Sequence, residues 1–212
     1  MKPKIYFSFV LLAAFILLLH SCDTAGKKQD NVAEIPQKIN PLKIGDKIPT
    51  IILNDYSGNV IELNKLFQFK PTILIYYRGI WCMYCNQQMA QIKEISQELQ
   101  DMGYQIIAIS ADKPEKVFEM KEKYEIGFTL LSDTSMSGAK SLGIAYDGKS
   151  IYQDMLLVLE ENSGTNNHIL PVPSIFIVNQ EGIIQFEYIN PNFKVRISPE
   201  LLLTAAKVAL EE

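Results

Sequence analysis

The clearest hydrophobic pattern in the chain is the unbroken apolar run at residues 72–77, which reads Thr-Ile-Leu-Ile-Tyr-Tyr. A short run without alternation is typical of a strand buried on both faces. Over residues 86–99, apolar side chains instead recur at steps of three and four, which predicts a helix with one buried face. The buried positions expected in that helix are Met89, Ile92, Ile95 and Leu99. The pattern therefore predicts a buried strand, a short connection and a helix.

The chain from residue 44 onward alternates short apolar runs with helical patterns. Strands are predicted over 51–53, 60–63, 104–110, 128–131, 171–178 and 183–188, and helices from Pro114, over 136–142 and from Ser198. The apolar segment 152–161 is predicted to be strand-like, and a loop follows at 162–168. This order predicts an α/β fold with a central mixed sheet flanked by helices, parallel neighbours joined by right-handed crossovers, and an extra N-terminal β-hairpin.

The first 21 residues have the pattern of a secretory signal, because Lys2 and Lys4 precede an apolar run at 5–19. That run is short for a spanning helix, which needs about 20 residues. The sequence Leu-His-Ser-Cys at 19–22 resembles the lipobox of bacterial lipoproteins, which implies cleavage before Cys22 and lipid attachment to it. The alternatives are a soluble secreted protein cut nearby and an uncleaved anchor.

We therefore expect a lipoprotein signal peptide at 1–21, a lipid-anchor cysteine and flexible tether at 22–43, and one folded domain at 44–212. The resemblance places the protein in the bacterial cell envelope, lipid-anchored and either periplasmic or associated with the outer membrane. Loss of the two signal-peptide lysines changes the balance from 20 basic against 24 acidic residues to 18 against 24, a net charge of −6. An acidic domain argues against nucleic acid as a partner, so membrane association is expected through Cys22.

Two cysteines, Cys82 and Cys85, lie between the predicted strand and helix. A Cys-x-x-Cys pair at such a junction is typical of a redox site in a thioredoxin-like fold. Cys82 is expected at or just before the first helical turn, where free N–H groups and the helix dipole stabilise a thiolate and lower its pKa below about 8.5. Cys85 lies one turn further along and is expected to be the less exposed, resolving thiol.

A structural disulfide and half of a zinc site are the alternatives for this pair. Zinc needs further Cys or His ligands, and the chain offers only His20, which is lost with the signal, and His168. We therefore predict no metal and no cofactor beyond a redox-active disulfide.

Three stretches of the domain resemble one known family. They are Tyr76-Tyr77-Arg78-Gly79-x-Trp81-Cys82-x-Tyr84-Cys85-Asn86, the segment Val172-Pro173-Ser174-Ile175-Phe176-Ile177-Val178 and the turn Asn179-Gln180-Glu181-Gly182. Residues of about 44 to 210 resemble the peroxiredoxin-like (alkyl hydroperoxide reductase/thiol-specific antioxidant, or redoxin) branch of the thioredoxin superfamily.

The resemblance implies roles for several residues. Cys82 would attack and Cys85 would resolve, with Trp81 as an aromatic neighbour. Pro173 would be a cis-proline that faces the pair, so that Val172 presents its backbone to a substrate. Arg78 either stabilises a thiolate or polarises a peroxide, or it is a solvated arginine at a strand end.

The chain also departs from the patterns of its relatives. Typical peroxiredoxins carry Pro-x-x-x-Thr-x-x-Cys, but Ile75 and Gly79 stand at the Pro and Thr positions, and Pro173 stands where those proteins have an arginine. Typical thioredoxins have a buried acid where this chain has Tyr76, and Gly-Pro where it has Met83 and Tyr84. The missing threonine hydroxyl and arginine guanidinium count against peroxide reduction, whereas the departures from thioredoxin leave the reduction potential of the pair open.

The sequence thus predicts an extracytoplasmic thiol-disulfide oxidoreductase that uses Cys82 and Cys85, with an external thiol donor and with protein disulfides as substrates. The alternative is a thiol peroxidase that reduces hydroperoxides through a sulfenic acid on Cys82. A third hypothesis is a non-enzymatic binding module stapled by its disulfide. No oligomeric state is predicted.

Overall fold

The computed structural model describes residues 31–211. The expected signal peptide at 1–21 and the lipid-attachment residue Cys22 lie outside the described residues. No helix within the described residues is long and apolar enough to cross a membrane.

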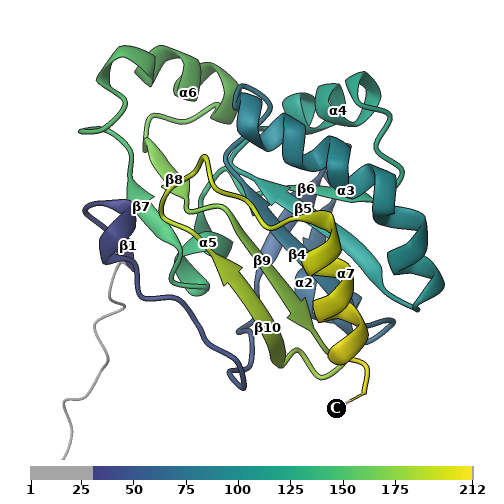
Figure 1. Cartoon of the computed structure of the whole chain (residues 1–212). Helices are drawn as coiled ribbons and strands as arrows, with labels where there is room; N and C mark the ends of the chain where they lie inside the picture. The colour runs from purple at the N-terminus through teal and green to yellow at the C-terminus, as the bar shows by residue number, and fades with distance from the viewer. Residues whose placement is uncertain (1–30, 212) are drawn as a thin grey trace, which may run out of the picture. The chain divides into compact units, whose positions relative to one another are not determined.

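A seven-stranded mixed sheet forms the centre of the domain, in the order β10-β9-β4-β5-β6-β2-β3 (Figure 1). Its strands are β2 (Ile52–Asp55), β3 (Val60–Glu62), β4 (Thr72–Tyr77), β5 (Gln105–Ser110), β6 (Thr129–Ser132), β9 (Ser174–Val178) and β10 (Ile184–Ile189). Strands β4, β5 and β6 are parallel, whereas β9 runs antiparallel to β4 and β2 pairs antiparallel with β3 and β6. The predicted mixed sheet and N-terminal hairpin are confirmed.

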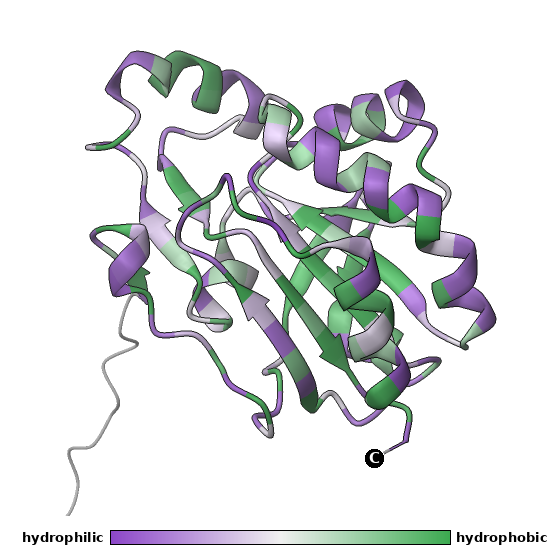
Figure 2. Ribbon diagram, viewed as in Figure 1, coloured by the Kyte–Doolittle hydropathy of each residue, from purple (hydrophilic) through white to green (hydrophobic). Residues whose placement is uncertain are grey.

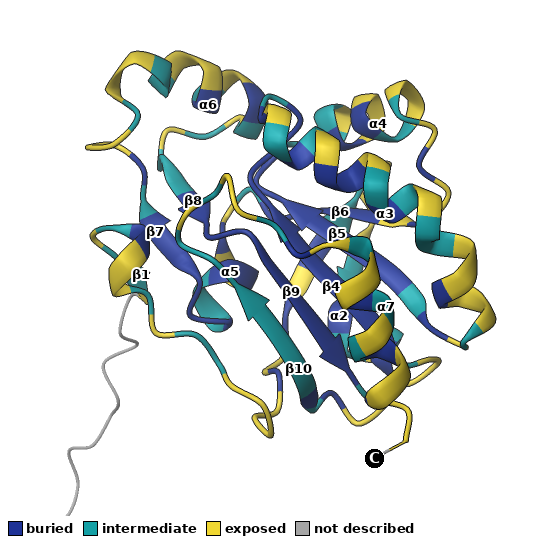
Figure 3. Cartoon of the chain, in the orientation of Figure 1, coloured by how far each residue is buried: buried dark blue, intermediate teal, exposed yellow. Residues whose placement is uncertain are grey.

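Helices cover both faces of this sheet. Those on its faces are α2 (Leu63–Phe67), α3 (Met83–Asp101), α4 (Pro114–Lys123), α5 (Ser137–Ser141) and α7 (Pro199–Val208), whereas α6 (Leu156–Ser163) packs through Leu159 with Tyr146, Leu170 and Val172. Alternate residues of β4 point to opposite faces: Ile73 and Ile75 pack with α3, α4 and α7, whereas Leu74 packs with α2 and α5. Figures 2 and 3 show the result, with hydrophobic, buried central strands and polar, exposed outer helix faces.

The segment 152–161 is not a strand, so that prediction is wrong. It forms a short 3-10 helix, Gln153–Met155, and then α6, which ends at Ser163 and is capped by Gly164 with a φ of +70°. Its apolar residues have no clear period, and tertiary packing selects the helix. Leu159 is buried, whereas Leu157 is 81% exposed.

The prediction of a flexible tether over 22–43 is also wrong for the part that the structure describes, residues 31–43. Within that part, β1 (Val32–Ala33) pairs in parallel with β7 (Ala145–Asp147), which pairs with β8 (Ile169–Pro171). Leu42 donates its backbone N–H to the Leu142 carbonyl over 3.0 Å. Val32 and Leu42 pack against the core, because even sparse apolar residues in a polar segment gain by burial.

Candidate active site

The two cysteines lie where β4 passes into α3. Cys82 precedes the first helical residue and has an extended backbone, with φ −92° and ψ 106°. Its carbonyl accepts the N–H groups of Cys85 and Asn86, each over 3.0 Å. The helix therefore begins at Met83, three residues earlier than predicted, and Cys82 occupies its N-cap position.

Both thiols are free and shielded from solvent, with Cys82 4% and Cys85 0% exposed. A hydrogen bond from the Cys85 thiol, together with the Arg78 cation, lowers the pKa of Cys82 to about 6, against the opposing effect of burial. Burial and the neighbouring Cys82 raise the pKa of Cys85 well above its usual value. Near neutral pH the pair thus holds one nucleophilic thiolate and one thiol.

Arg78 is buried, at 2% exposed, so it is not the solvated arginine that the sequence left open. Its Nη1 lies 4.0 Å from Cys82 Sγ. Its guanidinium lies over three aromatic rings, at 4.6 Å from the centroid of Trp81, 4.7 Å from Tyr152 and 4.2 Å from Phe193. Such contacts stabilise a cation without neutralising it, so its charge stays available to the thiolate.

A second arginine, Arg196, was not predicted. Its Nη2 donates to Cys85 Sγ over 3.4 Å. It lies in the irregular segment between β10 and α7, 111 residues from Cys85, and no sequence period marks it. Each sulfur of the pair therefore has its own guanidinium.

Asp112 supports the loop that carries Cys82. The residue is 1% exposed and lies just beyond the end of β5. Its Oδ2 accepts the Ile80 N–H over 2.8 Å and the Ser110 hydroxyl over 3.1 Å, and burial raises its pKa to about 7. A polar residue at the carboxyl end of the strand beside β4 is a signal that could have identified it.

The surroundings of Gly79 explain why this chain has no threonine at that position of the peroxiredoxin motif. A Cβ at this residue would lie 2.6 Å from both Asp112 Oδ1 and Trp81 Nε1, and its φ is +146°. The space that a threonine side chain would need is filled by Trp81 and Asp112.

Val172 and Pro173 do not have the geometry that the resemblance implied. No cis peptide bond occurs among residues 31–211, so the bond before Pro173 is trans. The Val172 N–H donates to the Ile144 carbonyl over 2.8 Å, and the Val172 carbonyl accepts the Ser174 hydroxyl over 2.8 Å. Its backbone is therefore engaged within the protein and is not presented to a substrate.

His168 lies in a loop, as predicted, and is 2.7 Å from Glu160 through its Nε2. With Trp81 and Asp112 it lines a cavity of about 10 Å³. Within the described residues, no group of three potential metal ligands comes together.

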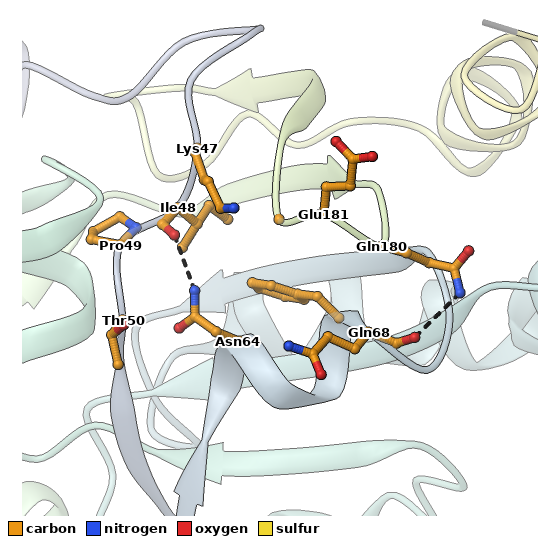
Figure 4. Close-up of a pocket in the computed structure, with 10 residues that line it drawn as sticks. Lys47, Ile48, Pro49, Thr50, Asn64, Gln68, Gln180 and Glu181 are labelled. Atoms are coloured by element: carbon orange, nitrogen blue, oxygen red, sulfur yellow. Dashed lines mark hydrogen bonds between the residues drawn. The ribbon is translucent and has the colours of Figure 1, made fainter.

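A larger cavity of about 640 Å³ lies between residues 47–50, α2 and the turn after β9 (Figure 4). Val178, just before that turn, pairs with Thr72 at the start of β4, whereas Cys82 follows the end of β4. The cavity and the thiols thus lie at opposite ends of the sheet, and its polar groups near Asn64 are already hydrogen-bonded within the protein.

Comparisons with known proteins agree with this geometry. A sequence model of the AhpC/TSA family matches residues 44–187. Peroxiredoxin Bcp of Escherichia coli K12 is 33% identical over 106 residues, which cover 50% of this chain and 67% of that protein. Peroxiredoxin Q of rice (Oryza sativa subsp. japonica), a chloroplast protein, is 26% identical over 146 residues, covering 69% of this chain and 58% of its own length.

Solved structures show the same fold. Peroxidoxin BcpB from Mycobacterium tuberculosis superposes with a TM-score of 0.63 at 16% identity, covering 79% of this chain and 97% of its own. Reduced Prx3 from Vibrio vulnificus in complex with hydrogen peroxide has a TM-score of 0.64 at 16% identity and covers 78% of this chain and 99% of its own. These likenesses confirm the predicted thioredoxin-like α/β fold.

Proposed function

This chain belongs to the AhpC/TSA family and is an oxidoreductase of the peroxiredoxin type, and we propose that it is a thiol peroxidase in which Cys82 reduces a hydroperoxide. One observation carries this choice over the disulfide exchange that the sequence favoured: Cys82 is only 4% exposed, with the buried Arg78 beside it. A protein disulfide must bring a bulky sulfur in line with the attacking thiolate. A small hydroperoxide needs much less access.

The first step would be attack of the Cys82 thiolate on the terminal peroxide oxygen. The O–O bond breaks, a sulfenic acid forms on Cys82, and the other oxygen leaves as an alcohol or as water after taking up a proton. Arg78 supplies positive charge beside the reacting sulfur. This cation would serve in place of the arginine that relatives carry where this chain has Pro173.

The second step would join the two sulfurs. Cys85 attacks the sulfenic sulfur, an S–S bond forms, and the hydroxyl group leaves as water with the proton of the Cys85 thiol. Side chains three apart on a helix have Cβ atoms about 5–6 Å apart, and a disulfide needs about 3.5–4.5 Å. Because Cys82 precedes the helix, a small shift there can close the bond with α3 intact. An external thiol donor would then supply two electrons and two protons.

The test is stopped-flow mixing of the reduced protein with hydrogen peroxide, followed by the fluorescence of Trp81, the only tryptophan. We expect Cys82 to react orders of magnitude faster than a free thiol at the same pH. Cys82→Ser should abolish the reaction, whereas Cys85→Ser should keep the fast phase and accumulate a sulfenic acid that dimedone traps. A rate equal to that of a free thiol, with rapid turnover of protein disulfides, would return the assignment to disulfide exchange.

We also propose that the protein is anchored in the cell envelope by lipid on Cys22, on the strength of the lipobox-like sequence at 19–22 alone. Expression in bacteria fed a labelled fatty acid tests this. Label should enter the native chain and be absent from Cys22→Ala, and an unlabelled native chain would refute the anchor.

A further inference from the structure

Arg196 is a cation whose closest acceptor is a sulfur. Its Nη2 donates to Cys85 Sγ over 3.4 Å, while its Nε and Nη1 are buried without a hydrogen-bond partner among the described residues. Within residues 31–211, no carboxylate lies within 4.0 Å of this guanidinium, since every ion pair there involves other residues. Arg196 as a whole is half-buried, but a guanidinium with shielded nitrogens and no counter-ion is costly, so this arrangement calls for an anion at the site.

The reduced pair holds that anion on Cys82, beside Arg78. In this state the negative charge of Cys82 helps to keep Cys85 protonated. Oxidation by a peroxide changes the balance, because the Cys82 thiolate becomes a neutral sulfenic acid. The charge that opposed ionisation of Cys85 is then gone, and the cation of Arg196 remains in contact with the Cys85 sulfur.

We propose that Arg196 is a catalytic residue of the resolution step, in which its guanidinium stabilises the negative charge that develops on Cys85 Sγ as this sulfur attacks the Cys82 sulfenic acid. The inference rests on the proposed peroxidase function and deepens it. The S–S bond forms, the S–O bond of the sulfenic acid breaks, and the hydroxyl leaves as water with the proton of Cys85. Arg196 transfers no proton; it holds charge at the sulfur.

The two guanidinium groups thus act in sequence. Arg78 contacts the sulfur that is charged before the peroxide arrives, and Arg196 contacts the sulfur that must become charged afterwards. Arg196 also helps to lower the pKa of Cys82, but less than Arg78 does, so loss of Arg78 should slow chiefly the first kinetic phase and loss of Arg196 chiefly the second.

The first experiment compares Arg196→Met with Lys194→Met in the full chain by two-phase stopped-flow with hydrogen peroxide. Lys194 is an exposed cation two residues away in the same segment, so its variant tests for a general effect of charge. We expect Arg196→Met to slow disulfide formation at least tenfold and to move its pH midpoint upward, with a much smaller effect on the first phase. Lys194→Met should leave both phases unchanged.

Arg196→Gln is the second neutral variant, because it keeps a polar donor amide on a shorter side chain and removes the charge. It should slow the second phase in the same way if its fold is intact by circular dichroism, and Arg196→Lys should recover part of the rate. An unchanged second phase in a folded neutral variant would overturn the proposal. Equal slowing in Lys194→Met would also overturn it, because the effect would then not belong to the contact with Cys85.

A measurement without peroxide separates this inference from the proposed function. In Cys82→Ala the neighbouring negative charge is absent, as it is after oxidation, and the Cys85 thiolate can be titrated by its absorbance at 240 nm. Adding Arg196→Met should move that titration to higher pH. An identical titration in both proteins would overturn the role of Arg196, whether or not the chain reduces peroxides.

Discussion

Arg78 Nη1 lies 4.0 Å from Cys82 Sγ, and no carboxylate in the described part of the chain lies within 4.0 Å of the Arg78 guanidinium. A carboxylate there would form a bidentate ion pair and cancel the charge that the thiolate needs. The rings of Trp81, Tyr152 and Phe193 stabilise the cation and leave its charge in place. The chain thus has a means of activating a thiol without the arginine of its relatives.

Replacement of this cation should weaken the nucleophile. In Arg78→Met we expect the pKa of Cys82 to rise by about 1–2 units, because a neighbouring opposite charge is lost, and the peroxide reaction at pH 6 to slow about tenfold. Arg78→Lys should retain part of the rate, since it keeps the charge and loses the planar group that stacks on the rings. Thiolate absorbance at 240 nm measures the pKa, and an unchanged pKa in a folded Arg78→Met would contradict this role.

The pH profile of the peroxide reaction should follow Cys82. Its pKa of about 6 predicts a rate that rises through pH 6 and is nearly constant above pH 7, whereas a free thiol is still gaining thiolate at pH 8. A folded-state pKa below the unfolded value also stabilises the fold as pH rises from about 6 to 8.5. The reduced protein should therefore exceed Cys82→Ser in unfolding free energy by more at pH 8 than at pH 5, measured by urea denaturation.

Asp112 should have the opposite effect on stability. Burial raises its pKa from 3.8 to about 7, so the native state binds this proton more tightly than the unfolded chain. The stability it confers is full below pH 3.8 and is lost as pH rises through 7. Asp112→Asn keeps an oxygen acceptor and carries no charge, so its stability does not change with this titration. As pH rises from 5 to 8, its free energy of unfolding should therefore increase by about 2–3 kcal/mol relative to that of the native chain.

Asp55→Asn is the matched control, because hydrogen bonds from residues 57–59 lower the pKa of Asp55. The stability that Asp55 confers is full above pH 3.8 and is lost only at lower pH, so Asp55→Asn should show almost no pH dependence relative to the native chain between pH 5 and pH 8. A difference between Asp112→Asn and the native chain that stays constant with pH would show that Asp112 is ionised normally.

Gly79 should resist substitution more than a glycine with open space around it. In Gly79→Ala the new Cβ would meet Asp112 and Trp81 at 2.6 Å, whereas at Gly103, with a φ of +99°, nothing lies within 4 Å. Both variants carry backbone strain of about 1–2 kcal/mol, and Gly79→Ala adds an overpacking cost of about 1–3 kcal/mol. Equal losses of unfolding free energy in Gly79→Ala and Gly103→Ala, measured by urea denaturation, would show that the loop relaxes freely. Gly79→Thr, which restores the residue of the relatives, should destabilise further and give no faster reaction.

Local pattern was enough to predict β4, because an apolar run beside a periodic helix has one good interpretation. The helical period begins only at residue 86, whereas α3 begins at Met83; the Cys-x-x-Cys spacing nevertheless predicts Cys82 at or just before the first helical turn. Local pattern failed over 152–161, where an apolar run has no period and only tertiary packing selects α6. Arg196 could not be predicted at all, since its contact with Cys85 is made by folding across 111 residues and leaves no trace in local sequence.

The prediction of a flexible tether failed over residues 31–43 for a related reason. Residues 31–43 are polar and aperiodic, yet β1 pairs with β7. The Leu42 N–H also donates to the Leu142 carbonyl, and Gly143 packs against the Asn40 carbonyl. A chain that starts at residue 44 should have a free energy of unfolding about 2–4 kcal/mol lower than a chain that starts at residue 31, and it should melt about 5–10 °C lower. Differential scanning calorimetry of the two compares them directly. Equal melting temperatures would mean that the segment only rests on the domain, because contacts that stabilise the fold cannot be removed without lowering its melting temperature.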